Sequence, residues 1–582
     1  MIMNQRTSRR TLLGGTAALA VAASGLTACT SGGKPKAPAT ALESMAPSVT
    51  AAPEVTGISY PDGYVGPRAR TISPIVTEPA SFTVLVPQDA RVGDWSKNYF
   101  SKWYQEQTGI EITFRQVAGG EDMMTKVNAM IAAGDVPDAF LGIPFSRSQL
   151  LQYGEQGMFA PLRSLIGGYA LNLQQAMKDY PDSYKLIRSP NDEIYAFPDY
   201  NDGKHARASE ARAFINTDWL ERLGLEEPTT TTAFQEVLRE FKKADLGGGG
   251  RTIPFAAYAE ASLDKYFMNS FLYHPGGLGL VVNGGTVETT VNKPEYREGL
   301  KYIKGLIDEG LINNDAVTAT ADQMLRRGNQ PGNTIMGGAR AYYWGLFVDI
   351  DQKDPEARWR QYRTLAPLEG PNKVRYSPWD YYTIGVETPT FVISGACERP
   401  ELLVQWADLQ YDLEVSLHAN LGKKGERWEW APEGVKGING KDALYYFPGG
   451  WNEKPADATS GWSLFSVSYR SEDYRLAEGV VEGNETFEKP LYEQTVEYNE
   501  PYKQPIEMQF PPVTLTEADA AEDAEISTNL QNEVSVALAK FSTGKLDPND
   551  DAAWQDYVER LDRIGLGRML ESRQAAYEQF MA

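Results

Sequence analysis

Residues 214–250 read FINTDWLERLGLEEPTTTTAFQEVLREFKKADLGGGG, and their pattern predicts a strand, a short helix, a longer helix and a glycine loop. Asn216 and Thr217 stand before an apolar turn, where a side-chain oxygen can accept a hydrogen bond from a free N–H group at a helix start. Gly224 follows the turn, and glycine adopts the left-handed conformation that ends a helix without steric cost. We therefore expect a short helix that ends at Gly224.

A longer helix is expected after the threonine run. Thr232 and Gln235 have the spacing of a capping box, in which each side chain binds the other residue's backbone N–H. Apolar residues then recur at helical spacing, which predicts one buried face: Phe234, Leu238 and Phe241. Taken alone, the stretch is a helix pair of an α/β domain.

The first 28 residues have the features of an export signal. A segment with three arginines precedes the apolar run Leu12–Ala23, which is too short to span a membrane. SRRTLL, residues 8–13, resembles a twin-arginine signal, and a Sec signal with two chance arginines is the alternative. We expect residues 1–28 to be removed as a signal peptide.

Leu26-Thr27-Ala28-Cys29 resembles a bacterial lipobox. The small residues fit a signal peptidase, and the Cys29 thiol is the nucleophile available for acylation. Ordinary cleavage beside an incidental cysteine is the alternative. We expect lipidated Cys29 to anchor the exported protein to the outer face of the bacterial cell membrane. Cys397 is the only other cysteine, so this leaves no disulfide, and Cys397 should be a buried thiol.

The composition of the chain excludes some classes of protein. A chain of 582 residues with 42% hydrophobic and 11% aromatic residues is long enough for two or more cores and is not a disordered protein. Loss of Arg6, Arg9 and Arg10 with the leader changes the formal net charge from −22 to −25. Such a charge argues against nucleic acid as a partner, against electrostatic adhesion to anionic lipid, and mildly against an anionic ligand.

Regular structure is expected from residue 81 onward. Residues 29–80 are rich in Ala, Pro, Ser, Thr and Gly, which is typical of a flexible tether. Strands then alternate with helices, which predicts a parallel, doubly wound sheet. The strands are expected at 81–87, 110–117 and 138–143, and the helices at 96–108 and 121–133. Ligands of such sheets gather beyond the carboxyl ends of the strands.

Motifs of enzymes are missing from the sequence. The three histidines are widely separated, and we find no Ser-His-Asp pattern, HExxH, GxSxG or P-loop. A pair of glycosidase carboxylates stays possible in so acidic a chain. We expect a protein that is not an enzyme and that holds no cofactor.

The order of seven segments resembles the family 1 extracellular solute-binding proteins of ABC importers, and in particular their large oligosaccharide-binding subgroup with alginate- and aldouronate-type members. The segments are DAFLGI, GMFAPL, EIYAFP, FINTDWLERLGLEEPTT, NTIMGGARAYYWG, CERPELLVQWADLQYD and GERWEW. The resemblance covers nearly all of residues 81–582.

This resemblance implies an α/β, two-lobed, periplasmic-binding-protein-like fold of type II, with discontinuous lobes joined by hinge crossovers. The first lobe would comprise 81–202 and 365–420, and the second 203–364 and 421–582. A monomer would capture an oligosaccharide between its lobes and deliver it to the transmembrane subunits of an ABC permease. A carbohydrate-active enzyme, or a receptor for a peptide or another solute, are the alternatives.

Sugar recognition requires aromatic rings for the apolar faces of pyranoses beside polar groups for the hydroxyls. The chain has 12 Trp and 31 Tyr, and core packing is the alternative role of each tryptophan. Several aromatic residues follow a predicted strand end or lie near a predicted lobe boundary. The expected ligand contacts are Trp344, Trp379, Asp380, Trp451, Tyr258, Asn201, Asp202, Arg340 and Tyr343.

One loop departs from the pattern of the subgroup. Several relatives carry an Asp- and Asn-rich calcium loop after the helix that matches residues 234–243, because calcium needs oxygen ligands at alternate positions of a tight turn. Here Asp245 is the only carboxylate of the loop, and Arg251 stands where a ligand would be. We therefore expect no metal.

Overall fold

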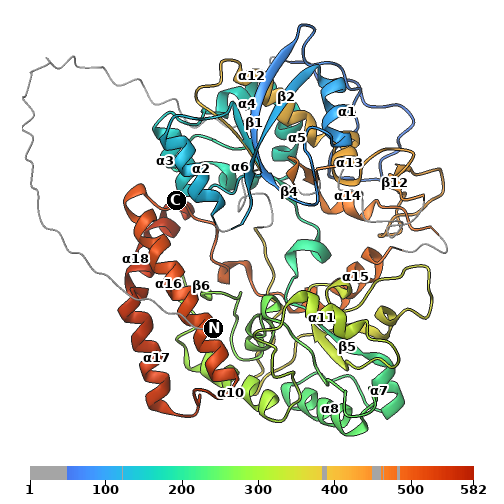
Figure 1. Ribbon diagram of the computed structural model, residues 1–582, viewed down its shortest axis with the longest axis vertical. Helices are drawn as coiled ribbons and strands as arrows, with labels where there is room; N and C mark the ends of the chain where they lie inside the picture. Colours follow the sequence, from blue (N-terminus) through green and yellow to red (C-terminus); the bar gives the residue numbers. More distant parts are fainter. Residues whose placement is uncertain (1–48, 121, 383–389, 449–459, 463–464, 482–485) are drawn as a thin grey trace, which may run out of the picture. The chain divides into compact units, whose positions relative to one another are not determined.

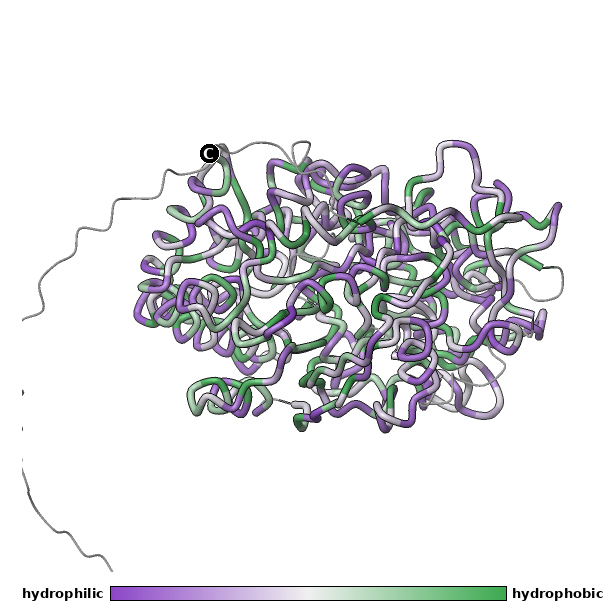
Figure 2. Tube along the Cα trace, turned by 90° about the horizontal axis from the view of Figure 1, so that it is seen from above, coloured by the Kyte–Doolittle hydropathy of each residue, from purple (hydrophilic) through white to green (hydrophobic). Residues whose placement is uncertain are grey.

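The computed structural model describes residues 49–582 apart from 121, 383–389, 449–459, 463–464 and 482–485. The predicted signal peptide, Cys29 and Trp451 lie outside the described residues. Hydrophobic and hydrophilic stretches alternate along the described chain (Figure 2). None of its described helices combines the length and the apolarity that a membrane crossing requires.

The first lobe is built on a four-stranded sheet in the order β10-β3-β1-β2. Figure 1 labels two of its strands, β1 and β2. Its strands are β1 (Ala80–Gln88), β2 (Ile110–Ala118), β3 (Ala139–Leu141) and β10 (Phe391–Ile393). β1 pairs in parallel with β2 and β3, so the predicted parallel sheet is confirmed, and β10 adds an antiparallel edge. Helices α1 (Tyr99–Thr108) and α2 (Met123–Ala132) connect the parallel strands, as predicted.

Helices and short strands complete the first lobe. They are α3 (Arg147–Glu155), α4 (Arg163–Tyr169), α5 (Leu171–Asp179), α6 (Ser183–Ile187), β4 (Tyr200–Asn201), α12 (Pro400–Asp408), η7 (Leu409–Tyr411), α13 (Leu413–Leu421), β11 (Glu429–Trp430), β12 (Tyr445–Tyr446), β13 (Tyr469–Arg470) and α14 (Glu472–Leu476).

The second lobe is centred on β5 (Ala213–Asn216), which pairs antiparallel with β8 (Gly338–Arg340) and β9 (Tyr362–Leu365). Two helices follow β5, namely α7 (Thr217–Leu223) and α8 (Thr231–Ala244) (Figure 1). The Asn216 side chain accepts a hydrogen bond from the Trp219 N–H at 3.0 Å, and Gly224 ends α7 with a φ of 64°. Both features of α7 were predicted from the sequence.

The start of α8 differs from the prediction. Thr230, not Thr232, caps the helix and accepts a hydrogen bond from the Ala233 N–H at 3.1 Å. A bridge to Glu369 holds Thr230 in extended conformation, so the helix begins two residues earlier than the capping-box pattern indicates. The Gln235 amide instead reaches Glu309, at 2.7 Å.

η2 (Lys204–Ala208) lies where the chain passes from the first lobe to the second. The remaining elements belong to the second lobe. They are η3 (Ala259–Ala261), α9 (Asp264–Phe267), η4 (Met268–Ser270), β6 (Leu280–Asn283), β7 (Thr286–Thr289), α10 (Pro294–Asp308), α11 (Ala321–Gly328), η5 (Trp344–Leu346), η6 (Arg358–Gln361), α15 (Glu488–Gln494), η9 (Thr495–Asn499), η10 (Glu500–Tyr502), η11 (Ile506–Met508), α16 (Glu517–Ser542), α17 (Asp551–Ile564) and α18 (Leu566–Met581).

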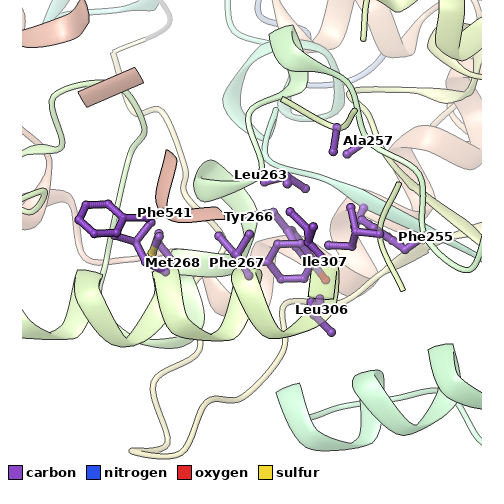
Figure 3. Packing of buried hydrophobic residues seen from close by; sticks show 14 of the residues in the cluster. Phe255, Ala257, Leu263, Tyr266, Phe267, Met268, Leu306, Ile307 and Phe541 are labelled. Carbon is purple, nitrogen blue, oxygen red and sulfur yellow. The ribbon is translucent and has the colours of Figure 1, made fainter. Parts of the chain in front are cut away.

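The main core of the second lobe joins residues from its first and last segments. Figure 3 shows Phe255, Phe267, Leu306 and Phe541 as members of one buried cluster. The α16 residues Leu530 and Val534 belong to the same cluster. Packing between segments that are far apart in sequence thus unites this lobe.

The sequence predicts a flexible tether over residues 29–80, but its described part, residues 49–80, packs partly against the first lobe. Tyr64 and Ala69 are buried in a cluster with Trp428. The Tyr60 hydroxyl accepts a hydrogen bond from the Ala69 N–H, at 2.8 Å. A chain segment rich in Pro and Gly can bury aromatic surface without any regular period, so the sequence pattern missed this packing.

Two lobe boundaries also differ from the prediction. The described residues of 421–480 pack with the first lobe, because β13 pairs with β4 and Trp428 shares a cluster with Leu413. Residues 365–382 pack with the second lobe, where the Leu368 carbonyl accepts a hydrogen bond from the Ser270 hydroxyl at 2.7 Å. The chain therefore passes between the lobes over 202–212, again between the described residues 382 and 390, and again between 481 and 486; we call these the first, second and third crossings.

Candidate functional site

One edge of the second-lobe sheet brings together three segments. The start of β5 pairs with the end of β8, so that Ala213 lies opposite Arg340. The loop before η3 joins them, since the Arg340 N–H donates to the Ala256 carbonyl at 2.9 Å. The Tyr342 hydroxyl donates to the Glu260 carbonyl in η3, at 3.4 Å. The first crossing enters the lobe at this edge of the sheet. We call this edge, which includes Ala213, Ala256, Glu260, Arg340 and Tyr342, the crossing edge.

Arg340 lies beneath the crossing edge and is fully buried, with 0% of its surface exposed. Its Nη1 donates to the Arg212 carbonyl at 2.9 Å and to the Glu210 carbonyl at 3.3 Å. Nε and Nη2 have no hydrogen-bond partner among the described residues. Burial lowers the pKa of this guanidinium, so Arg340 holds the backbone of the edge at an electrostatic cost.

Aromatic residues line the crossing edge. Tyr258 is 2% exposed, and burial raises the pKa of its hydroxyl to about 12. Tyr342 and Tyr343 are only partly buried, and the Tyr343 ring stacks on Phe487 with centroids 5.7 Å apart. Tyr342 was not among the predicted contacts, although its place just beyond β8 was the available signal.

Charged residues belong to the segments of the crossing edge. Glu210 and Lys265 are partly exposed, with Oε2 and Nζ 3.6 Å apart, and Glu260 is exposed. The crossing edge thus combines ring surface with hydrogen-bond donors and acceptors. It brings together three predicted residues, namely Tyr258, Arg340 and Tyr343.

Trp344 does not offer the predicted stacking surface. It is 1% exposed, and its Nε1–H donates to the Tyr362 carbonyl at 3.0 Å. Its ring packs against Phe214 and Trp359, at 5.1 Å and 5.3 Å between centroids. The turn η5 directs this side chain into the core, so Trp344 stabilises the lobe.

Trp379 and Asp380 lie on the approach to the second crossing. Trp379 is 7% exposed, and its N–H and carbonyl both bind the Gln504 side-chain amide, at 2.8 Å and 2.7 Å. The Asp380 N–H donates to the Ala208 carbonyl of the first crossing at 2.8 Å. Asp380 Oδ1 accepts from Gln509 Nε2, also at 2.8 Å. Both predicted residues therefore fix the backbone where the crossings meet.

Asn201 and Asp202 stand at the first-lobe end of the first crossing. Asn201 Oδ1 accepts from Arg475 Nε and Nη2, at 3.0 Å and 2.6 Å. Asp202 Oδ2 accepts from the Tyr180 hydroxyl at 2.7 Å, and burial raises the pKa of this carboxyl. Their contacts anchor the crossing to the first lobe.

Charged groups connect the two lobes across η2. Lys204 Nζ lies 3.6 Å from Glu472 of the first lobe and 3.3 Å from Glu500 of the second. His205 Nε2 lies 2.5 Å from Glu488, which follows the third crossing. Burial raises the pKa of Glu472 to about 7. The first crossing therefore lies within a network of ion pairs.

A separate cavity of about 300 Å³ lies beside the second crossing. It is lined by Leu280, Tyr382, Gln509, Phe510, Pro511, Pro512, Val513, Leu515 and Arg573. Its volume is at the lower end of the range for small-molecule sites. The proline-rich run of the lining has no period that sequence reasoning could have used.

The glycine loop after α8 uses its oxygen atoms internally. Asp245 Oδ1 and Oδ2 accept from the Thr252 hydroxyl and the Gly250 N–H, each at 2.8 Å. Arg251 donates to the carbonyls of Gly247 and Gly248, at 3.0 Å and 3.1 Å. The Arg251 guanidinium thus binds loop carbonyl oxygens of the kind that calcium takes as ligands. Within the described ranges, no three His, Cys, Asp or Glu side chains are grouped as metal ligands would be.

Comparison with known proteins agrees with this architecture. Fructooligosaccharide ABC transporter substrate-binding protein FusA of Streptococcus pneumoniae serotype 4 is 26% identical over 491 residues, 82% of this chain and 86% of FusA. The structure of FusA in complex with kestose has a TM-score of 0.69 at 23% identity, covering 86% of this chain and 99% of that chain. An HMO-binding, ABC-transporter-associated solute-binding protein of Bifidobacterium longum infantis gives 0.70 at 22% identity, with the same coverages.

These likenesses establish the α/β, two-lobed, periplasmic-binding-protein-like fold. The named relative is a substrate-binding protein. Residues 77–388, more than half of the chain, match the family described as bacterial extracellular solute-binding protein. The chain therefore belongs to the bacterial extracellular solute-binding proteins.

Proposed function

We propose that this protein is the substrate-binding component of an ABC importer, which captures an oligosaccharide between its lobes and delivers it to a permease. The similarity to FusA, a fructooligosaccharide-binding protein, supports the sugar class. The similarity to an HMO-binding protein agrees with it. The protein performs no covalent chemistry on its ligand.

The observation that carries this proposal is the composition of the crossing edge. Tyr342 and Tyr343 are partly exposed beside Glu210, Glu260 and Lys265. A pyranose or furanose has an apolar face for an aromatic ring and hydroxyls for the polar groups. We place the ligand here, with Tyr258 and Arg340 supporting the edge from beneath.

Closure follows from the three crossings. An oligosaccharide that contacts both lobes binds the closed state more tightly than the open one and shifts the population toward closure. Trp379, Asp380, Asn201 and Asp202 serve the hinge in this account, since their contacts are with crossing backbone and neighbouring side chains. The closed form would be the one that docks on the permease.

The location of the protein follows from the sequence. Members of its family are extracellular, so the chain is exported. We propose that lipidation of Cys29 holds a monomer at the outer face of the cell membrane, beside the permease subunits.

Titration with a sugar panel tests the proposal. Isothermal calorimetry would measure binding of kestose as a neutral probe and trigalacturonic acid as an acidic one. Tyr342→Ala should lower the affinity for the probe that binds by about tenfold, because an aromatic contact is worth roughly 0.5–1.5 kcal/mol. Tyr446→Ala, at a partly buried tyrosine of β12, should leave affinity unchanged. Conversion of a probe into products would instead indicate an enzyme.

A further inference from the structure

Arg212 connects three segments through one buried guanidinium. It is 1% exposed and lies at the end of the first crossing. Nη2 donates to the His205 carbonyl in η2 at 2.7 Å and to the Thr495 hydroxyl in η9 at 3.0 Å. Nη1 donates to the Tyr342 carbonyl at 2.9 Å. The hinge, the helix after the third crossing and the crossing edge thus share one side chain.

This arrangement is electrostatically expensive. Arg212 forms no ion pair with a carboxylate within the described chain, and burial lowers its pKa to about 9. The neighbouring Glu210 and Glu488 face other side chains, since Glu210 Oε2 lies 3.6 Å from Lys265 Nζ and Glu488 Oε2 lies 2.5 Å from His205 Nε2. An apolar replacement would remove this buried charge but would leave the carbonyls of His205 and Tyr342 and the Thr495 hydroxyl without the donor that Arg212 supplies.

We propose that Arg212 is a positioning residue that makes the hinge segment 203–209 and the loop 341–346 move as one unit. The proposal rests on the proposed function, in which a sugar at Tyr342 triggers closure. Any displacement of the Tyr342 backbone changes a bond to Arg212, and the same guanidinium holds the carbonyl of His205. The His205–Glu488 contact extends this connection to α15.

A lysine could not replace this geometry. The planar guanidinium directs separate N–H groups at two carbonyls and a hydroxyl, whereas an ammonium is a compact charge on a flexible stem. Arg340 adds rigidity, because its Nη1 binds the Arg212 carbonyl at 2.9 Å.

Hydrogen exchange of the ligand-free full chain tests the proposal. Arg212→Met should raise amide exchange in both 203–209 and 341–346 by about tenfold, while α10 keeps its wild-type rates. Arg358→Met is the matched control, because Arg358 also donates to three carbonyls of the second lobe, those of Gly328, Gln330 and Gly332. The control should raise exchange near 328–332 alone.

Two results would overturn the proposal. One is unchanged exchange in either segment of the Arg212 variant, and the other is a uniform rise across the second lobe. Should Arg212→Met fail to fold, Thr495→Val decides the matter, because it removes one partner of the guanidinium and keeps the charge. We expect this variant to raise exchange two- to fivefold in the same two segments, with unchanged rates overturning the proposal. A wild-type chain that binds no sugar would contradict the proposed function. The exchange measurements on the ligand-free chain would still decide whether Arg212 couples the two segments.

Discussion

Replacing Gln504 by leucine should destabilise the backbone at Trp379, just before the second crossing. The size of the loss can be worked out from the hydrogen bonds that are removed. Gln504 is fully buried, and its amide satisfies both the N–H and the carbonyl of Trp379. Leucine fills a similar volume but leaves two buried backbone groups without partners. Each such group costs about 1–3 kcal/mol, so the free energy of unfolding should fall by about 2–6 kcal/mol.

Urea denaturation followed by tryptophan fluorescence measures this loss, and hydrogen exchange reports the Trp379 amide directly. Gln174→Leu is the matched control, since the Gln174 amide also binds two carbonyls, in the first lobe at 2.8 Å and 3.1 Å. The control should lower stability without accelerating exchange at Trp379. A change below about 0.5 kcal/mol in the Gln504 variant would refute the reasoning, because that is the range of inconsequential surface substitutions.

Three further predictions concern the glycine loop, a buried acid and the second-lobe core. Chelation by EDTA should leave the melting temperature unchanged, whereas Arg251→Ala should cost about 1 kcal/mol in urea because two bonds to loop carbonyls are lost. Burial and the nearby Glu488 raise the pKa of Glu478 from 4.5 to about 8, so the loss of its proton lowers the stability of the fold as pH rises from 4.5 to 8. Glu478→Gln should therefore reduce the fall of melting temperature with pH over this range. An unchanged pH dependence would contradict the burial argument. Trp344→Phe should lower the free energy of unfolding by about 1–3 kcal/mol, because the Tyr362 carbonyl loses its indole donor. Sugar affinity measured by calorimetry should not change. Lost affinity with intact stability would instead show that Trp344 contacts the ligand.

Local signals in the sequence were reliable where the physics is local. Asn216 and Gly224 delimit α7 because a cap and a left-handed glycine act within one turn. The stripe of Phe234, Leu238 and Phe241 on α8 was visible because helical spacing alone identifies a buried face. The choice of Thr232 over Thr230 failed because a bridge to Glu369, distant in sequence, fixes the helix start.

Features that depend on distant segments could not be predicted. The packing of Tyr64 against residues more than three hundred positions away has no local pattern. Trp344 follows a strand end, as a ligand-binding aromatic would, yet one turn of backbone directs it inward. Arg340, the last residue of β8, and Tyr343, just beyond it, were predicted as ligand contacts from their position near a strand end. The role that we propose for Arg212 depends on all three segments that it binds, which no local pattern shows.

The central claim is that an oligosaccharide closes the two lobes, and small-angle X-ray scattering tests it most directly. The radius of gyration would be measured for the wild-type chain and for Tyr342→Ala, each with and without kestose or trigalacturonic acid at matched concentration. The account predicts that one probe reduces the radius of the wild type and that the variant needs about ten times more of it for the same change. An unchanged wild-type radius with both probes, or equal responses of the two proteins, would contradict the account.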